Sequence, residues 1–363
     1  MIGRSTRGIL AVLMLMSSIL VAQETRAMRR AMTAQEFERL REKVGVYEQG
    51  RNYNVVVDGF GTGLRPPTAE EWEEMRKVEC VVDETEGSEM ALPSSHDNSA
   101  TKWFPPIGNQ DGEGSCVSWA YGYYTKTFQE AKEHDWDLSA CVWEGGYYGH
   151  PSSEYQDRIF SPEFIYHQVN DGVDEGSSSA DNAKLLERIG CCSWERMPYD
   201  GSNWTRWPDE DAWREAPWYR SLTGYTEMWV QTDEGLEDLK QLLYEGNLAI
   251  ISVNAYFYGD LTPEDLWTLD NYPLPSLIHA NTVVGYDDDF GPYSEGGNPD
   301  TYGAFKVANS WGKGSWENVP DGFLHISYEC MKQRVEWVEF YENRVNYEPQ
   351  MVSVFQLRLW YYG

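Results

Sequence analysis

The chain has 363 residues, a formal net charge of -30, and an aromatic share of 14% that includes 16 tryptophans and 24 tyrosines. This negative charge would repel phosphate backbones and anionic lipids, so it argues against nucleic acid and membrane surfaces as partners. If residues 1–22 are removed as an export signal, about 340 residues remain, enough for one large domain with attachments or for two domains.

Residues 1–22 have the pattern of an export signal peptide. Arg4 and Arg7 precede an uncharged apolar run, and Ala22 and Ala27 offer small residues for cleavage. The run is shorter than the roughly 20 apolar residues that a membrane span requires, which favours a cleaved signal. The alternative is an uncleaved anchor helix. The sequence therefore predicts an exported protein, secreted or retained on the cell-envelope side, whose mature chain is soluble.

Residues 23–90 carry two helix signals but no apolar periodicity of a self-sufficient core. Thr33 and Thr68 each precede a glutamate by three residues, which is the capping-box spacing at a helix start. Between these helices, residues 54–64 have the pattern of a short strand followed by glycine turns. The region is predicted to be either a pro-segment, which would block a cleft until its removal, or a collar on the main domain.

From residue 91 onward, predicted helices come first and predicted strands follow. One helix is expected to open at Cys116, a second has Ser161 as N-cap and Pro162 at its first position, and a third is stopped by Gly190. After a further helix, the apolar, β-prone runs are 248–257, 278–289, 302–312 and 322–329. This order predicts an α+β domain with two lobes and a cleft between them.

The cysteines bear on both the compartment and the chemistry. In an oxidising compartment most of them are expected to form disulfides, but five cysteines besides a free Cys116 leave the pairing open. No two cysteines have the spacing of a zinc site, and no two histidines stand four residues apart, so neither a metal site nor a cofactor is predicted. The six cysteines are Cys80, Cys116, Cys141, Cys191, Cys192 and Cys330.

Four residues provide the components of nucleophilic catalysis by a thiol. Cys116 opens a predicted helix, whose dipole lowers the pKa of a thiol. Gln110 stands six residues upstream, where its amide could bind an oxyanion. His279 begins a β-like run and could serve as base, and Asn309 could orient that imidazole. Each of these residues taken alone more often has a structural role.

Three sequence blocks, taken together and in this order, resemble the papain family of cysteine peptidases. The likeness covers about residues 91–330. It implies a helical left lobe that carries the nucleophile, a β-rich right lobe that carries the base, and a peptide or protein substrate across the cleft. The blocks are "PIGNQDGEGSCVSWA", "IHANTVVGYDDD" and "GAFKVANSWGKGSW", the last followed by "DGFLHISYE".

The resemblance implies a role for each matching residue. Cys116 resembles the family's nucleophile and His279 its partner in a thiolate–imidazolium pair. Asn309 resembles the residue that orients the imidazole, and Gln110 the oxyanion donor. The implied reaction is peptide hydrolysis through a thioester.

Further positions match or depart from the family pattern. Trp311 resembles the shielding tryptophan, and Gly114 and Ser115, next to the cysteine, lie where the family lines its substrate floor. Val117 follows the cysteine where plant and animal members have tryptophan, and Glu113 replaces a cysteine that is bridged in many members. These departures suggest an exported branch of prokaryotic style.

The predicted function is therefore an exported cysteine-type endopeptidase. Two alternatives remain at this stage: a transglutaminase-like acyltransferase, and a non-catalytic surface or binding protein on a peptidase scaffold. The predicted organisation is a signal peptide at 1–22, a pro-segment or collar at 23–90, a papain-like peptidase domain at 91–335, and a strand-like extension at 336–363.

Overall fold

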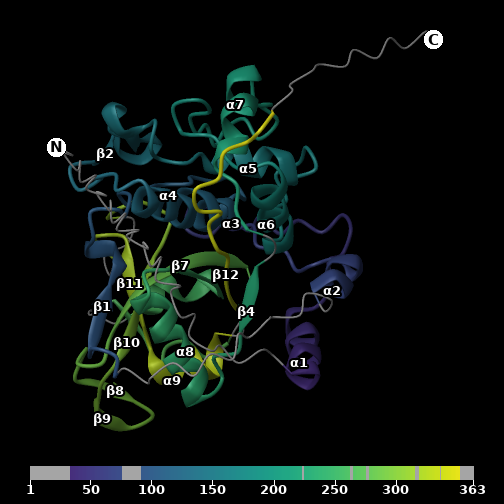
Figure 1. Ribbon diagram of the computed structural model, residues 1–363. Helices are drawn as coiled ribbons and strands as arrows, with labels where there is room; N and C mark the ends of the chain where they lie inside the picture. The colour runs from purple at the N-terminus through teal and green to yellow at the C-terminus, as the bar shows by residue number, and fades with distance from the viewer. Residues whose placement is uncertain are drawn as a thin grey trace, which may run out of the picture.

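The computed structural model confirms the predicted α+β fold class. A helical N-terminal part and a β-sheet-rich C-terminal part pack against each other, as Figure 1 shows. The predicted signal peptide and Cys80 lie outside the described residues. The structure describes residues 33–75, 91–222, 225–261, 265–274, 278–314, 319–335 and 337–351.

The helices within these ranges are mostly short and lie largely in the first two-thirds of the chain. They are α1 (Ala34–Val44), α2 (Ala69–Met75), α3 (Cys116–Ser118), α4 (Thr127–Glu133), α5 (Pro162–Val169), α6 (Ser179–Arg188), α7 (Glu210–Glu215), α8 (Asp233–Tyr244) and α9 (Tyr328–Arg334). Helix α3 passes without a break through a π-helical stretch, Trp119–Lys126, into α4.

Side-chain caps fix where several of these helices begin. Thr33 and Glu36 form the predicted capping box, because each side chain accepts a hydrogen bond from the other residue's backbone N–H. The Ser161 hydroxyl accepts from the backbone N–H of Phe164, and Pro162 occupies the first turn, where its missing N–H costs nothing.

The described strands form one eight-stranded sheet and two small hairpins. The sheet order is β4-β12-β5-β7-β10-β11-β6, with β1 paired to the far end of β7. The strands are β1 (Ser95–Asp97), β2 (Trp143–Glu144), β3 (His150–Pro151), β4 (Thr226–Met228), β5 (Ala249–Val253), β6 (Leu266–Trp267), β7 (His279–Asp287), β8 (Tyr293–Glu295), β9 (Asn298–Thr301), β10 (Ala304–Ala308), β11 (Phe323–Ser327) and β12 (Val338–Phe340).

Strand β7 occupies the centre of the sheet and carries one of the candidate residues. It pairs antiparallel with β5 along one edge and with β10 along the other. Eight of its nine residues are buried, because helices α3 and α8 and the π-helical stretch pack against it. His279, at its first position, therefore stands at the junction between the sheet and the helical part.

Helices α1 and α2 pack on the C-terminal part rather than forming a core of their own. Phe37, Leu40 and Trp72 bury their side chains against Trp337, which precedes β12. The Trp72 ring lies edge-on to Phe37 at 5.5 Å and stacks on Trp337 at 6.0 Å between centroids.

The sequence-based prediction of a strand in residues 54–64 is wrong. This segment contains only isolated bridges, one between Val57 and Phe60 around a turn at Asp58 and Gly59, and one between Leu64 and Ser177. Its glycine-rich half directs its backbone hydrogen bonds to distant parts of the chain, among them Asp111 and Ile278. Those partners replace the neighbouring strand that the local pattern suggested.

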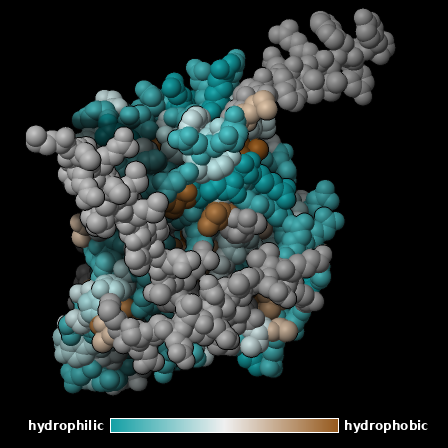
Figure 2. All heavy atoms as spheres, viewed as in Figure 1, coloured by the Kyte–Doolittle hydropathy of each residue, from teal (hydrophilic) through white to brown (hydrophobic). Residues whose placement is uncertain are grey.

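The disulfides expected from export are not confirmed in the described part of the chain. Each of the five described cysteines is a buried free thiol: Cys116, Cys141, Cys191, Cys192 and Cys330. Within the described ranges, none of the helices combines the length and apolar composition that a bilayer crossing requires. Outside the grey atoms, the face in Figure 2 is predominantly hydrophilic, in keeping with the high net charge.

Candidate active site

Cys116 lies at the start of α3, with no solvent-exposed surface. The backbone N–H of Ala280 donates to its Sγ at 3.3 Å. Its own backbone N–H donates to the carbonyl oxygen of Thr62 at 3.4 Å. The thiol is thus held at a helix start, between the first turn of α3 and the beginning of β7.

His279 immediately precedes the residue that contacts this sulfur, and its imidazole is oriented by Asn309. The ring Nε2 lies 2.9 Å from the Asn309 Oδ1. The same oxygen accepts from the Asn281 Nδ2 at 2.9 Å and from the Ser310 backbone N–H at 2.8 Å. These two donors fix the amide so that its oxygen, rather than its nitrogen, faces the ring.

This arrangement determines the tautomer of neutral His279. A carbonyl oxygen only accepts hydrogen bonds, so Nε2 must carry the proton and Nδ1 must be the basic nitrogen. Nδ1 is buried and has no hydrogen-bond partner among the described residues. The structure therefore brings Cys116, His279 and Asn309 together, and leaves the basic nitrogen unengaged.

Two aromatic rings pack around His279. Trp311 lies 4.7 Å from the imidazole and Tyr258 lies 6.1 Å from it, measured between ring centroids. Trp311 and Tyr258 contact each other at 5.0 Å, and both are fully buried. Rings in these positions keep water away from the hydrogen bond between His279 and Asn309, which strengthens it.

Gln110 lies in the loop before α3, where hydrogen bonds at both ends fix its side-chain amide. Its Nε2 donates to the Glu113 carbonyl oxygen at 2.9 Å, and its Oε1 accepts from the Ser310 hydroxyl at 2.6 Å. Its backbone N–H donates to the Ser310 carbonyl at 2.7 Å. These contacts link the cysteine loop directly to the asparagine block.

The other predicted site residues, Gly114 and Ser115, continue this loop towards the cysteine. The Gly114 N–H donates to an oxygen of Asp174 at 2.8 Å. The hydroxyls of Ser115 and Tyr199 lie 2.8 Å apart. The loop is therefore held by polar contacts from the helical part rather than by a disulfide.

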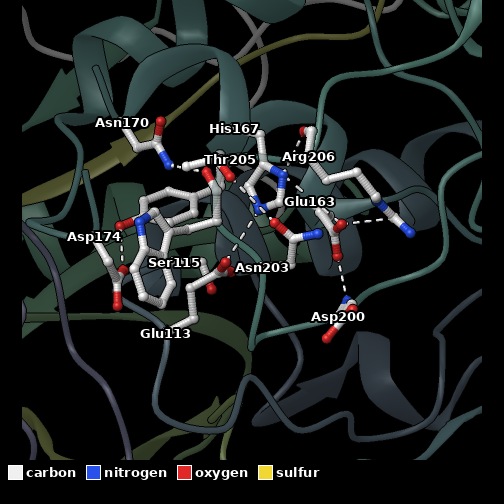
Figure 3. A network of polar contacts seen from close by, with 12 residues as sticks. Glu113, Ser115, Glu163, His167, Asn170, Asp174, Asp200, Asn203, Thr205 and Arg206 are labelled. Carbon is white, nitrogen blue, oxygen red and sulfur yellow. Dashed lines mark hydrogen bonds and ion pairs between the residues drawn. The ribbon is translucent and has the colours of Figure 1, made fainter. Parts of the chain in front are cut away.

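Glu113 anchors the same loop through a buried histidine on α5, as Figure 3 shows. Its Oε1 lies 3.1 Å from the His167 Nε2, and the other ring nitrogen, Nδ1, lies 2.8 Å from the Arg206 carbonyl and 3.8 Å from Glu163. Burial raises the pKa of Glu113, although the hydrogen bond from His167 opposes that shift. Burial lowers the pKa of His167, but Glu113 and Glu163 outweigh it and the net pKa is raised.

The segment from Gly61 to Arg65 lies directly over Cys116. Hydrogen bonds join Gly61 N to Asp111 O at 2.8 Å, and Leu64 N to Ile278 O at 3.2 Å. Leu64 pairs with Ser177 in a parallel bridge. The segment therefore contacts both the cysteine loop and the residue before His279.

Glycine is required in this segment because the backbones approach closely. Gly63 has a φ of +110°, which side chains of L-residues rarely adopt. A Cβ atom at Gly63 would lie 2.1 Å from the carbonyl oxygen of Gly114. Arg65 then secures the end of the segment through ion pairs with Glu71 and Asp181.

The covered site keeps both members of the pair neutral. Burial raises the pKa of Cys116 to about 12, although backbone N–H groups including that of Ala280 oppose this shift. Burial lowers the pKa of His279 to about 4, although the hydrogen bond to Asn309 opposes it. Both shifts have the same cause, so exposure of the site would reverse both.

Sequence reasoning missed several residues that build the site, among them Asn281, Tyr258 and His167. Asn281 could have been found, because residues two apart on a strand share one face and His279 begins this strand. Tyr258 and His167 lie in segments with no motif, and only the fold brings them to the site.

Comparisons with known proteins found similar solved structures but no match by sequence. No protein-family model matches the chain, and no curated protein matches it by sequence. Its structure is similar to xylellain, a cysteine protease from Xylella fastidiosa, with 19% identity and a TM-score of 0.49, over 82% of this chain and 98% of that one. The cysteine protease and lectin-like domains of Cwp84, a surface layer associated protein of Clostridium difficile, show 16% identity and a TM-score of 0.49, over 88% of this chain and 61% of that one.

The bromelain protease from Ananas comosus, solved with the E64 inhibitor, gives 16% identity and a TM-score of 0.46, over 69% of this chain and 99% of that one. At such identities and TM-scores the likeness carries no argument about the activity of this chain. The chemistry of the site depends instead on the contacts of Cys116, His279 and Asn309.

Proposed function

We propose that the protein is an exported cysteine-type endopeptidase that hydrolyses peptide bonds through a thioester. The observation that carries this proposal is the arrangement around His279. The peptide N–H that follows it contacts the Cys116 sulfur at 3.3 Å, while Asn309 holds its Nε2 at 2.9 Å. A thiol, a base with a free nitrogen and an orienting amide are the components that covalent catalysis by cysteine requires.

The first half of the reaction forms the acyl-enzyme. The Cys116 thiol gives its proton to His279 Nδ1, and the thiolate attacks the carbonyl carbon of the substrate. The oxyanion that develops accepts hydrogen bonds from the Cys116 backbone N–H and from Gln110 Nε2. The C–N bond then breaks, His279 protonates the departing amine, and a thioester to Cys116 remains.

The second half releases the acid. A water molecule gives a proton to His279 Nδ1 and attacks the thioester carbon, and the same two donors stabilise the second oxyanion. The C–S bond breaks, the carboxylic acid leaves, and the thiol regains its proton. Throughout both halves, the Asn309 oxygen accepts from Nε2 and so favours the imidazolium that forms in each step.

Residues 61–65 inhibit this reaction until they leave the site. The carbonyl oxygen of Thr62 already accepts the Cys116 N–H that an oxyanion would need. Gln110 Nε2 donates to Glu113 rather than to Thr62, so the carbonyl of the segment lacks the second donor. This segment therefore covers the nucleophile without being positioned for attack.

The test is covalent labelling of the full-length protein by a mechanism-based thiol probe, before and after limited proteolysis of the N-terminal segment. Release of the segment should increase labelling at Cys116, located by mass spectrometry of the modified peptide, together with hydrolysis of peptide substrates. The matched control is Cys141→Ser, since Cys141 is the described free thiol with the most solvent-exposed surface, at 7%. That variant should label as the wild type does.

Three outcomes would contradict the proposal or favour an alternative. Labelling elsewhere than Cys116 would refute the assignment of the nucleophile. Release of ammonia on addition of an amine acceptor would favour the acyltransferase. Absence of both labelling and turnover, once the segment has left, would favour a non-catalytic binding protein.

A further inference from the structure

Residues 56–65, called the covering segment, include Gly61–Arg65 over Cys116 and place one large side chain beside Trp311. Phe60 is 95% buried, and its ring stacks on Trp311 with centroids 5.1 Å apart and an angle of 10° between the planes. The same ring contacts Tyr147 at 5.5 Å with an angle of 41°. The Tyr147 hydroxyl also donates to the Gly59 carbonyl at 3.2 Å.

Tyr147 belongs to the β2–β3 hairpin, a loop of the helical part that no catalytic role described above uses. Asn109 joins this loop to the site, because its Nδ2 donates to the Tyr147 carbonyl at 3.0 Å and its backbone forms a bridge with Trp311. Within the hairpin, Trp143 Nε1 donates to the Gly146 carbonyl at 2.8 Å. These contacts fix the backbones of Tyr147 and Trp311 through groups outside the covering segment. The polar atoms of both rings bond to the segment itself, because Trp311 Nε1 donates to the Gly61 carbonyl at 3.0 Å, as the Tyr147 hydroxyl does to Gly59.

The position of His279 shows which part of a substrate would meet these rings. The departing amine takes its proton from His279, whose ring lies 4.7 Å from Trp311. Residues after the scissile bond therefore lie on the Trp311 side of Cys116. Residues before it lie on the opposite side, where Leu64 of the covering segment pairs with Ser177.

We propose that Tyr147 and Trp311 form a binding site for an aromatic side chain within the first two substrate residues after the scissile bond. The inference rests on the proposed peptidase function and names the substrate class of the same site. In the covered state Phe60 occupies this site. When the segment leaves, a substrate phenylalanine, tyrosine or tryptophan takes its place.

The chemistry of the two rings favours an aromatic occupant over an aliphatic one. Aromatic pairs in stacked or tilted arrangements contribute about 0.5–1.5 kcal/mol beyond the apolar area that they bury. Two such contacts would favour an aromatic over an aliphatic side chain of equal area by about tenfold or more. Trp311 is fully buried in the covered state, so an empty site would expose apolar surface that a substrate ring could cover again.

The first experiment profiles cleavage of a diverse peptide library by the full-length protein after release of its N-terminal segment. Sequencing of the products by mass spectrometry should show about tenfold enrichment of aromatic residues in the first two positions after the cut. Tyr147→Ala should remove most of this enrichment and leave the preference before the cut unchanged. Tyr147→Phe should retain the enrichment, and so should Tyr148→Ala, the matched control at an 80% exposed neighbour.

The outcomes separate the two proposals. Cleavage without aromatic enrichment, or enrichment that persists in Tyr147→Ala, would overturn the aromatic site and leave the peptidase function standing. Absence of cleavage by the wild type, with no labelling of Cys116, would overturn the peptidase function and the aromatic site together.

The second experiment needs no turnover and uses the intact full-length chain. Phe60→Ala should speed alkylation of Cys116 by about tenfold, because the covering segment loses its ring contacts and opens more often. Phe60→Trp should alkylate at nearly the wild-type rate. Val56→Ala is the matched control, since Val56 lies on the same segment but is 57% exposed. Equal rates for Phe60→Ala and Val56→Ala would overturn the assignment of Phe60 as occupant.

Discussion

Two buried histidines flank the loop that carries Cys116, and their partners give them opposite properties. His279 faces the neutral amide of Asn309, and its pKa is lowered to about 4 by burial. His167 faces the carboxyls of Glu113 and Glu163, and its pKa is raised. Burial disfavours the charged form of both rings, so the difference comes from the partners.

This difference suits the two rings to different tasks. Carboxyls at both nitrogens of His167 hold a proton firmly, which suits a clamp between α5 and the cysteine loop. The amide at His279 fixes the orientation of the ring but not its charge, and it leaves Nδ1 unengaged among the described residues. A ring that must take up and release a proton in every cycle requires the second arrangement.

The largest effect on the reaction is expected from removal of the base, His279, or of the nucleophile, Cys116. Cys116→Ala and His279→Ala should each lower peptidase kcat by about 10⁴-fold or more, because the members of such a set act as one unit. His325→Ala is the matched control: His325 is half-buried and its pKa is also lowered to about 4, but it stacks on Phe290. Equal losses of kcat in His279→Ala and His325→Ala would show that removal of a packed histidine lowers the rate wherever it lies, and that His279 is not the base.

His167→Ala should act mainly on stability. Removal of one partner of a buried charged pair costs about 3–5 kcal/mol in the free energy of unfolding, measured by urea denaturation. His134→Ala, at a histidine that is 43% exposed beside Glu130, should change it by about 0.5 kcal/mol or less. A similar small change in His167→Ala would mean that the pair does not clamp the loop.

The pH dependence of stability should carry the signature of the same pair. The pKa of His167 is raised above 6.5 in the fold, so its contribution is fully present below that pH and is lost as pH rises through the folded value. Glu113, whose pKa is also raised, contributes with the same sign. The wild-type free energy of unfolding should therefore fall as pH rises above about 6.5, and part of that slope should vanish in His167→Gln.

Asn309→Ala should have a smaller effect on the reaction. Loss of the hydrogen bond to His279 removes about 1–3 kcal/mol of orientation and imidazolium stabilisation, which corresponds to roughly 10- to 100-fold in kcat. Asn309→Asp should instead raise the pKa of His279 and move the acid limb of the pH–rate profile upward, because a carboxylate would make this site resemble that of His167. An unshifted pH–rate profile would mean that residue 309 orients the His279 ring without setting its pKa.

Local signals predicted much of the fold, because their physical causes are local. The cap at Thr33 reaches only three residues along the chain, and the strand at His279 is marked by its own apolar run. The three sequence blocks also pointed to the residues that meet at Cys116, since each block carries its residue at an element end.

Contacts between distant segments escaped prediction. Glu113 stood out as a departure from the family pattern, but its partner His167 is 54 residues away on a helix without a motif. The strand expected in residues 54–64 failed for the same reason, because the partners of this segment lie in three remote loops. Where a side chain or backbone group finds its partner depends on packing that no local window contains.

The smallest expected effect concerns the outer end of the His167 cluster. Arg206 lies 2.6 Å from the Glu163 Oε1 and is 34% exposed. Burial raises the pKa of Glu163 to about 7, while Arg206 opposes the shift. The contribution of Glu163 to stability is therefore present below about pH 4.5 and is lost as pH rises through about 7. Because Arg206 favours the charged carboxylate, its removal would make this loss of stability larger. Arg206→Gln should thus match the wild type near pH 5 and be less stable by about 1 kcal/mol or less near pH 8.

Arg214→Gln, which removes an exposed pair with Glu210, should show no such dependence on pH. A pH-independent loss in Arg206→Gln would instead mean that Arg206 acts through its hydrogen bond to the Pro198 carbonyl, and that the charge of Glu163 is controlled from the His167 side alone.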